Sequence, residues 1–170
     1  MGGHCISVDP WFLVESAPDI SRLIYSARQV NDSQPHFVLG LISNSMGGIN
    51  GKKITALGLA YKPDVDDLRE SPAIEVVHLL KEAGAEVVAY EPYKPKADLP
   101  GISIEKDLEV ALAGADAVIL LVSHKELCDL SPSKMSKITP ARILIDTVNG
   151  WDRKEWEAAG FTIFKLGANR

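Results

Sequence analysis

From Lys52 to the end of the chain, short runs of consecutive apolar residues alternate with segments in which apolar residues recur at a helical period. The apolar runs are residues 52–61, 85–93, 117–124, 142–150 and 161–167. The helical segments are residues 71–84, 107–116 and 153–160. Continuous Val/Ile/Leu runs predict strands buried on both faces, and strands separated by helices favour a parallel sheet. The pattern therefore predicts an α/β, Rossmann-like domain with helices on both faces of its sheet.

A different pattern precedes this domain. Residues 19–46 carry apolar side chains near a 3.6-residue period, which predicts a long helix. Pro35 lies inside it and should kink or divide it, because proline has no N–H to donate and clashes with the preceding turn. The Gly-rich residues 47–51 end this segment, and residues 1–15, punctuated by Gly and Pro, predict a loop.

The turns that follow the strands are candidate ligand sites, because sheets of this kind bind ligands at the carboxyl ends of their strands. They read GLAYKPD (58–64), YEPY (90–93), SHKE (123–126) and DTVNG (146–150). A dinucleotide site would need G-x-G-x-x-G after the first strand. That turn instead reads Gly58-Leu59-Ala60-Tyr61-Lys62-Pro63. The domain is therefore not expected to hold NAD in the usual Rossmann manner.

Composition and charge narrow the class of protein. Hydrophobic residues make up 46% and charged residues 24% of the 170 residues, as in ordinary globular proteins. The net charge of -5 argues against nucleic-acid binding, since no basic field would attract phosphates. We find no signal-peptide pattern and no apolar run long enough to cross a membrane. Two distant cysteines favour a reducing compartment, so a cytoplasmic protein is expected.

The stretch GGHCISVDPWF near the start of the chain contains the first candidate for chemistry. Glycines beside Cys5 would let a ligand approach the thiol closely, and Asp9 could accept a proton or orient a water. A Cys–Asp pair suits covalent chemistry on a carbonyl carbon. The alternative is a partly buried cysteine with no chemical role, and the spacing alone leaves both open.

The stretch YKPDVDDLRESPA, residues 61–73, is the second candidate. Lys62 follows a strand and Arg69 precedes a helix start, so together they could clamp a phosphate or a carboxylate. The alternative is a solvated loop whose charges pair with one another. His124 also follows a strand, but no second His or Cys lies at metal-ligand spacing. We therefore expect a locally hydrogen-bonded histidine and no metal site.

Four motifs together suggest a family. GGHCISVDPWFL, ARQVND, GLAYKPDVDDLRESPA and DTVNG, in this order, resemble the UDP-glucose/GDP-mannose dehydrogenase family, and most closely its branch acting on UDP-N-acetyl-D-mannosamine. Members combine an N-terminal NAD-binding domain, a central helix that forms the dimer and a C-terminal nucleotide-sugar domain. The resemblance implies a catalytic cysteine loop (1–16), a central dimerisation helix (17–50) and a UDP-sugar-binding domain (51–170). The NAD-binding domain is expected to be absent, which would make the chain a C-terminal portion.

The resemblance also implies an activity. Such enzymes oxidise the C6 alcohol of a UDP-sugar to a carboxylate with two NAD molecules, here giving a UDP-aminouronic acid for surface polysaccharide. The intermediate is held on a cysteine, as a thiohemiacetal and then a thioester. On this match Cys5 is the nucleophile and Asp9 activates water. Gly2, Tyr61 and Lys62 are expected to contact the UDP-amino-sugar substrate.

The resemblance to the family also implies one contact with the cofactor, and the sequence departs from the family's pattern at two positions. Arg69 corresponds to an arginine that reaches NAD. Val8 stands where UDP-glucose dehydrogenases carry lysine, and Val148 stands where the family often has a basic residue. Without the NAD-binding domain the chain is expected to be inactive and to form a homodimer through its central helix. The alternatives are a UDP-N-acetylglucosamine or UDP-glucose dehydrogenase portion, or a non-catalytic nucleotide-binding or dimerisation module.

Overall fold

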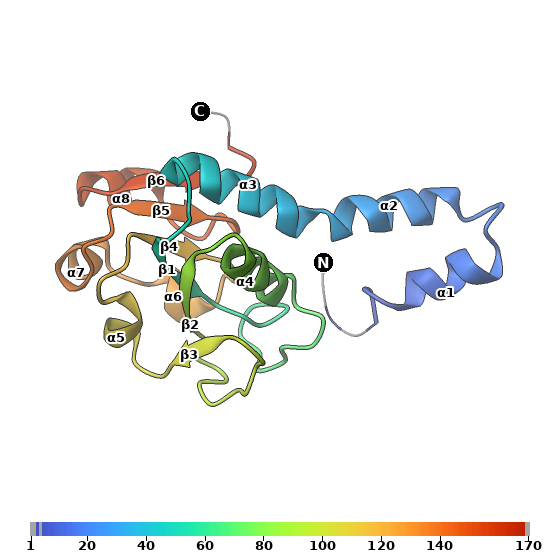
Figure 1. Ribbon diagram of the computed structural model, residues 1–170, viewed down its shortest axis with the longest axis horizontal. Helices are drawn as coiled ribbons and strands as arrows, with labels where there is room; N and C mark the ends of the chain where they lie inside the picture. Colours follow the sequence, from blue (N-terminus) through green and yellow to red (C-terminus); the bar gives the residue numbers. More distant parts are fainter. Residues whose placement is uncertain (1–2, 4, 169–170) are drawn as a thin grey trace.

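The computed structural model describes residue 3 and residues 5–168. Its centre is a six-stranded, all-parallel sheet in the order β3-β2-β1-β4-β5-β6 (Figure 1). The strands are β1 (Lys53–Leu57), β2 (Glu86–Tyr90), β3 (Ser103–Glu105), β4 (Ala117–Leu120), β5 (Ile143–Asp146) and β6 (Thr162–Lys165). The helices are α1 (Asp9–Ser16), α2 (Arg22–Asp32), α3 (Gln34–Met46), α4 (Pro72–Glu82), α5 (Leu108–Leu112), α6 (Lys125–Cys128), α7 (Pro132–Ile138) and α8 (Arg153–Ala158). This arrangement confirms the predicted Rossmann-like fold.

The sheet separates two hydrophobic cores, because successive side chains of a strand point to opposite faces. In β4, Ala117 and Ile119 belong to the core that also holds the apolar sides of α3 and α4. Val118 and Leu120 belong to the second core, which includes residues of α5, α6, α7 and α8. Both faces of the sheet are thus covered, which explains why its strands read as continuous apolar runs.

The segment before the sheet forms a helical arm. The predicted long helix is divided at Ser33 into α2 and α3, and Pro35 lies in the first turn of α3, as its missing N–H allows. The two helices run nearly end to end, and α1 folds back beside α2 (Figure 1). Trp11 and Tyr25 hold α1 on α2 in an edge-to-face contact with ring centroids 5.8 Å apart. The prediction that Pro35 divides the helix is confirmed.

Some elements differ from the sequence prediction. Residues 9–16 form α1 rather than a loop, with Pro10 in the first turn. Strand β3 and helices α6 and α7 were not predicted. β3 has only three residues and α6 only four, too short for any period to show. Helix α7 does carry a start signal: Ser131 caps it and Pro132 opens it, as Ser71 and Pro72 do for α4.

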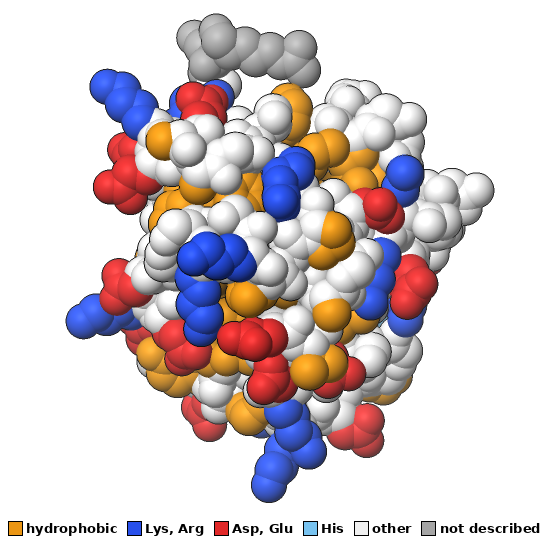
Figure 2. All heavy atoms as spheres, turned by 90° about the vertical axis from the view of Figure 1, so that its left-hand side faces the viewer, with side chains coloured by type: hydrophobic (Ala, Val, Ile, Leu, Met, Phe, Trp, Pro, Cys, Tyr) orange, Lys and Arg blue, Asp and Glu red, His pale blue; other side chains and the backbone are white. Residues whose placement is uncertain are grey.

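The surface carries charges of both signs. At the end of the molecule opposite the helical arm, basic and acidic side chains are interspersed and apolar atoms form small separate patches (Figure 2). This face offers no basic field of the kind that nucleic acids require. Among the described residues, no helix is both long and apolar enough to span a bilayer.

Candidate functional site

The carboxyl ends of β1 and β4 frame a small cavity. These strands are neighbours in the sheet, and the strand order reverses between them, so this edge is the switch point where such sheets bind ligands. The cavity has a volume of about 160 Å³. It is lined by Ala60, Tyr61, Lys62, Pro63, Pro72, Ala73, Leu121, Val122, Ser123 and Val148. Two of the predicted substrate contacts, Tyr61 and Lys62, therefore lie in its wall.

Gly58 lets the two strand ends approach each other. Its φ of 87° lies in the left-handed region, and a Cβ atom there would stand 2.6 Å from the Cβ of Val122. Its N–H donates to the Tyr90 carbonyl at 2.9 Å. Only glycine combines this conformation with so close a contact. Gly58 therefore sets the spacing between the turn after β1 and the turn after β4.

A buried carboxylate holds the turn after β1. Glu91, which directly follows β2, is fully buried, and its Oε2 accepts the N–H groups of Leu59 at 2.6 Å and Ala60 at 3.0 Å. Its Oε1 accepts the N–H of Tyr93 at 3.0 Å. Burial acts to raise the pKa of Glu91, but hydrogen bonds from His124 and from these backbone groups outweigh it and lower the pKa. Glu91 is thus an ionised carboxylate at neutral pH.

His124 connects Glu91 to the far end of the same loop. It is fully buried, and its Nδ1 accepts the N–H of Asp64 at 2.8 Å. An accepting Nδ1 assigns the ring proton to Nε2, which lies 3.1 Å from Glu91 Oε2 and donates to it. Tyr93 stacks on the ring with centroids 4.8 Å apart. The expectation of a locally hydrogen-bonded histidine is confirmed.

The cysteine loop lies against the loop after β1. Gly3 is buried, and a Cβ atom on it would stand 2.8 Å from Cε2 of Tyr61. The Gly3 N–H donates to the Glu70 carbonyl at 3.3 Å. Lys62 Nζ stands 5.4 Å from the centroid of the same Tyr61 ring. These contacts bring the cysteine loop, Tyr61 and Lys62 together, while the predicted contact Gly2 lies outside the described residues.

Cys5 and Asp9 lie within this loop. The N–H of Asp9 donates to the Cys5 carbonyl at 2.8 Å, and both residues are exposed. The Cys5 thiol is exposed, so the expectation of a partly buried cysteine is wrong, while its chemical role stays a prediction. Neither side chain is among those that line the small cavity.

Arg69 is paired within its own loop. Its Nε lies 2.9 Å from Asp67 Oδ1 and its second terminal nitrogen 2.6 Å from Asp67 Oδ2, a two-point contact. The side chain remains 64% exposed. The hydrogen bond to Asp67 chiefly raises the pKa of Arg69, and the nearby Cys5 adds a smaller contribution. Arg69 therefore fits the alternative in which the charges of residues 61–73 pair with one another.

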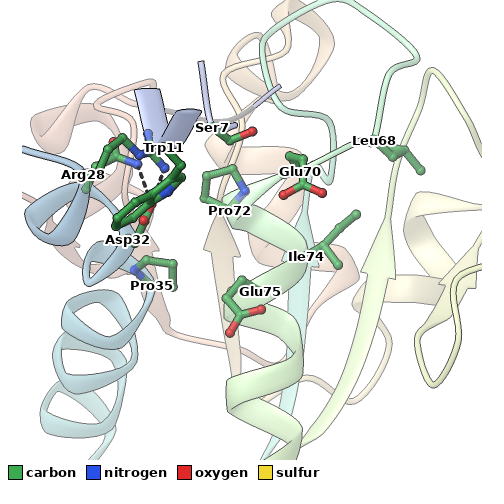
Figure 3. Close-up of a pocket in the computed structure, with 12 residues that line it drawn as sticks. Ser7, Trp11, Arg28, Asp32, Pro35, Leu68, Glu70, Pro72, Ile74 and Glu75 are labelled. Atoms are coloured by element: carbon green, nitrogen blue, oxygen red, sulfur yellow. Dashed lines mark hydrogen bonds and ion pairs between the residues drawn. The ribbon is translucent and has the colours of Figure 1, made fainter. Parts of the chain in front are cut away.

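A larger cleft opens on the other side of the cysteine loop. It has a volume of about 630 Å³ and separates the α1–α2 side from the start of α4 (Figure 3). Trp11, Arg28, Asp32 and Pro35 face Glu70, Pro72, Ile74 and Glu75 across it. Arg28 forms an ion pair with Asp32 and donates to the Ile6 carbonyl at 3.2 Å. Ser7 lines this cleft, so the cysteine loop touches the surroundings of both cavities.

Sequence reasoning missed the role of Glu91. Glu91 is part of the candidate turn YEPY and directly follows β2, the position at which dinucleotide-binding domains carry a ribose-binding acid. Ser123 of the candidate turn SHKE and Pro72 and Ala73 of the candidate stretch 61–73 do line the cavity, whereas Leu121 and Val122 were not among the candidates. Among the described residues, no group of three or more His, Cys, Asp or Glu side chains is arranged to hold a metal ion.

Comparison with known proteins decides the family. Residues 55–153 match the UDP binding domain of the UDP-glucose/GDP-mannose dehydrogenase family. The chain belongs to this family. The match covers the sheet from β1 through β5 and both turns that meet at the small cavity. The resemblance stated from the four motifs is therefore confirmed.

Relatives within the UDP-glucose/GDP-mannose dehydrogenase family extend the match to the cysteine loop and the helical arm. A Ralstonia nicotianae NDP-N-acetyl-D-galactosaminuronic acid dehydrogenase is 40% identical, over 91% of this chain and 36% of its own length. A Methanocaldococcus jannaschii UDP-N-acetyl-D-mannosamine dehydrogenase is 38% identical, over 98% of this chain and 38% of its own. The solved Pyrococcus horikoshii UDP-D-ManNAc dehydrogenase has a TM-score of 0.84 at 31% identity, covering 98% of this chain and 38% of that one. The chain thus spans less than two fifths of these relatives.

Proposed function

We propose that this chain is the UDP-sugar-binding and cysteine-bearing part of a UDP-N-acetyl-D-mannosamine 6-dehydrogenase. The observation that carries the proposal is the contact between the cysteine loop and the loop after β1. Gly3 packs on Tyr61, and Lys62 Nζ stands 5.4 Å from the centroid of that ring, at the wall of the switch-point cavity. A sugar bound there by its diphosphate would extend toward Cys5.

The cavity offers a diphosphate two kinds of favourable contact. Lys62 is an exposed cation in its wall. Pro72 and Ala73, the first residues of the 11-residue helix α4, line the same wall, and the positive end of the helix dipole favours anions there. Tyr61 provides an aromatic face beside them. We propose Tyr61 and Lys62 as substrate contacts on this basis.

The proposed chemistry of the cysteine is addition to a C6 aldehyde. The Cys5 thiolate forms a C–S bond to the aldehyde carbon, and the carbonyl oxygen takes up a proton, which gives a thiohemiacetal. After that carbon has been oxidised to a thioester, Asp9 accepts a proton from a water that attacks it. The C–S bond then breaks, the carboxylate leaves and Cys5 regains its thiolate. Overall one alcohol and one water become a carboxylate, with four electrons removed.

A dehydrogenase requires a nicotinamide to accept those electrons, and we propose NAD. NAD does not fit the turn after β1, because Glu91 already takes the N–H groups of Leu59 and Ala60 and the cradle glycines are missing. Hydride transfer is therefore assigned to none of the described residues. The contact of Arg69 with NAD stays a prediction.

UDP binding tests the nucleotide site directly. In ¹⁵N–¹H correlation spectra, UDP titrated to millimolar concentration should shift the amides of residues 58–62, 64, 121–124 and 148. Lys62→Ala should weaken binding about five- to tenfold, the size of one cation–phosphate contact. Lys137→Ala, on α7 and outside the cavity wall, is the matched control and should bind UDP as the wild type does. An unshifted wild-type spectrum would rule out the site.

The activity of these 170 residues alone gives a second test. Mixed with NAD and UDP-N-acetyl-D-mannosamine, they should produce no absorbance at the NADH wavelength, since no described turn accommodates the dinucleotide. Steady NADH formation would refute this part of the proposal. The Ralstonia relative, named for another N-acetylhexosamine, makes the galactosamine-type sugar the second candidate substrate.

We propose a homodimer through the helical arm. Its surface bears large apolar side chains exposed to solvent, including Ile20 at 88% and Leu23 at 82%. Phe12, Leu13 and Val30 are exposed as well. Several large apolar side chains exposed on one segment are typical of an interaction site. Sedimentation equilibrium should give the mass of two chains, and Leu23→Asp should shift it toward one; a monomeric wild type would contradict the proposal.

A further inference from the structure

Glu91 occupies a position that a ligand fills in related folds. In a dinucleotide-binding sheet, the backbone N–H groups of the turn after the first strand face the pyrophosphate. Here the N–H groups of Leu59 and Ala60 both donate to one carboxylate oxygen of Glu91. That oxygen also receives the Nε2 proton of His124 at 3.1 Å. Three donors thus converge on one buried anionic oxygen that belongs to the protein itself.

The same two residues hold both ends of the loop that follows β1. Glu91 binds the first end at Leu59 and Ala60, and His124 binds the second end at the N–H of Asp64. Asp64 has a left-handed φ of 59°, a conformation that is costly for a residue with a Cβ atom. Its Oδ1 accepts the Lys125 N–H at 2.9 Å and the Tyr93 hydroxyl at 3.0 Å, which stabilises that conformation. Tyr61, Lys62 and Pro63 form the part of the loop between these two anchors.

We propose that Glu91 takes the place of a bound phosphate at the turn after β1, and that Glu91 and His124 are positioning residues for the diphosphate-binding loop. The inference rests on the proposed function and goes beyond it, since neither residue touches the proposed substrate cavity. Glu91 satisfies the turn's donors and repels a second anion from them. The diphosphate is thereby directed outward to Lys62 and the start of α4.

His124 offers a way to separate the two anchors. In His124→Asn the amide oxygen stands at the place of Nδ1 and can still accept the Asp64 N–H, but the side chain is too short to reach Glu91. In His124→Gln the amide nitrogen reaches Glu91 and can donate to it, but no acceptor remains for Asp64. A role limited to stability predicts that the UDP affinity of both variants stays at the wild-type value, since the cavity wall is unaltered.

The test is a UDP titration of the wild type and of both variants. The titration is monitored in ¹⁵N–¹H correlation spectra at a temperature below each variant's melting temperature. We expect His124→Gln to lose about tenfold in UDP affinity, because the Lys62 end of the loop is released, and His124→Asn to stay within about twofold. Equal affinity of His124→Gln and the wild type would overturn the inference and leave the proposed function standing. A wild type that binds no UDP would overturn both.

A second measurement needs only the wild-type protein and remains decisive if the variants do not fold. Titration with inorganic pyrophosphate should shift the amides of Lys62 and Ala73 and leave those of Leu59 and Ala60 in place. The Leu59 and Ala60 amides should also resonate far downfield without any ligand, as donors to a carboxylate do. Pyrophosphate-dependent movement of Leu59 and Ala60 larger than that of Lys62 would show that the turn still accepts a phosphate, and would refute the inference.

Discussion

Gly58→Ala should be among the most damaging single-methyl additions to this protein. The new Cβ would lie 2.6 Å from Val122 Cβ and 3.1 Å from the Val122 backbone nitrogen, at a φ of 87°. A left-handed conformation costs a residue with a Cβ atom about 1–2 kcal/mol. Overpacking against a backbone that cannot retreat adds about 1–3 kcal/mol. The free energy of unfolding should therefore fall by about 2–5 kcal/mol, a large share of the roughly 5–15 kcal/mol typical of a domain.

Gly47→Ala is the matched control for this variant. Gly47 also has a positive φ, 66°, but a Cβ atom there would have no other atom within 4 Å. Its cost should be the conformational part alone, about 1–2 kcal/mol. Urea unfolding followed by circular dichroism measures both free energies. A Gly58→Ala loss no larger than that of Gly47→Ala would refute the claim that contact with Val122 sets the distance between the two strand ends.

Two further predictions concern ionisation and capping. Because the pKa of Glu91 is lowered from its ordinary 4.5, its ionisation stabilises the fold above about pH 4.5, and this contribution is lost as the pH falls through the lowered folded-state pKa. Wild-type stability should thus fall more steeply than that of Glu91→Gln between about pH 5 and pH 2 in urea titrations; parallel curves would contradict this. Ser71→Ala removes the acceptor for the Ala73 N–H at the start of α4 and should lower the unfolding free energy by about 1 kcal/mol, or about 2–4 °C in melting temperature. Ser26→Ala, on the exposed side of α2, is the control and should change the melting temperature by less than about 1 °C. An equal loss in both variants would contradict the claim that the Ser71 side chain stabilises the start of α4.

The sequence predicts those parts of the fold that depend on local patterns. The buried strands, the cap at Ser71 and the division near Pro35 each depend on a signal within a few residues, and the structure has all three. The six-stranded order needs a strand, β3, whose three residues are held by pairing with β2 rather than by their own pattern. No local pattern could have revealed it.

The candidate site was predictable only where its residues directly follow a strand in the sequence. Tyr61 and Lys62 stand out because they follow a strand directly. The role of Glu91 depends on a contact with Leu59 32 positions earlier in the chain, and a carboxylate in a strand-end turn ordinarily faces water. The burial of Glu91 is explained by its hydrogen bonds with the turn after β1 and with His124, which only the folded structure brings together. Long-range hydrogen bonds, rather than residue types, carried the missing information.

The anchored loop after β1 also has a thermodynamic consequence. A loop that its ligand must order loses conformational entropy at the moment of binding, which weakens the observed affinity. Here Glu91 and His124 fix both loop ends through contacts within the protein, so that loss is already incurred when the chain folds. Nucleotide binding should accordingly show a small entropy of ordering and an association rate not limited by loop closure. In dinucleotide-binding sheets a bound phosphate occupies the turn after the first strand. In this chain the side chains of Glu91 and His124 organise that turn and the loop that follows it.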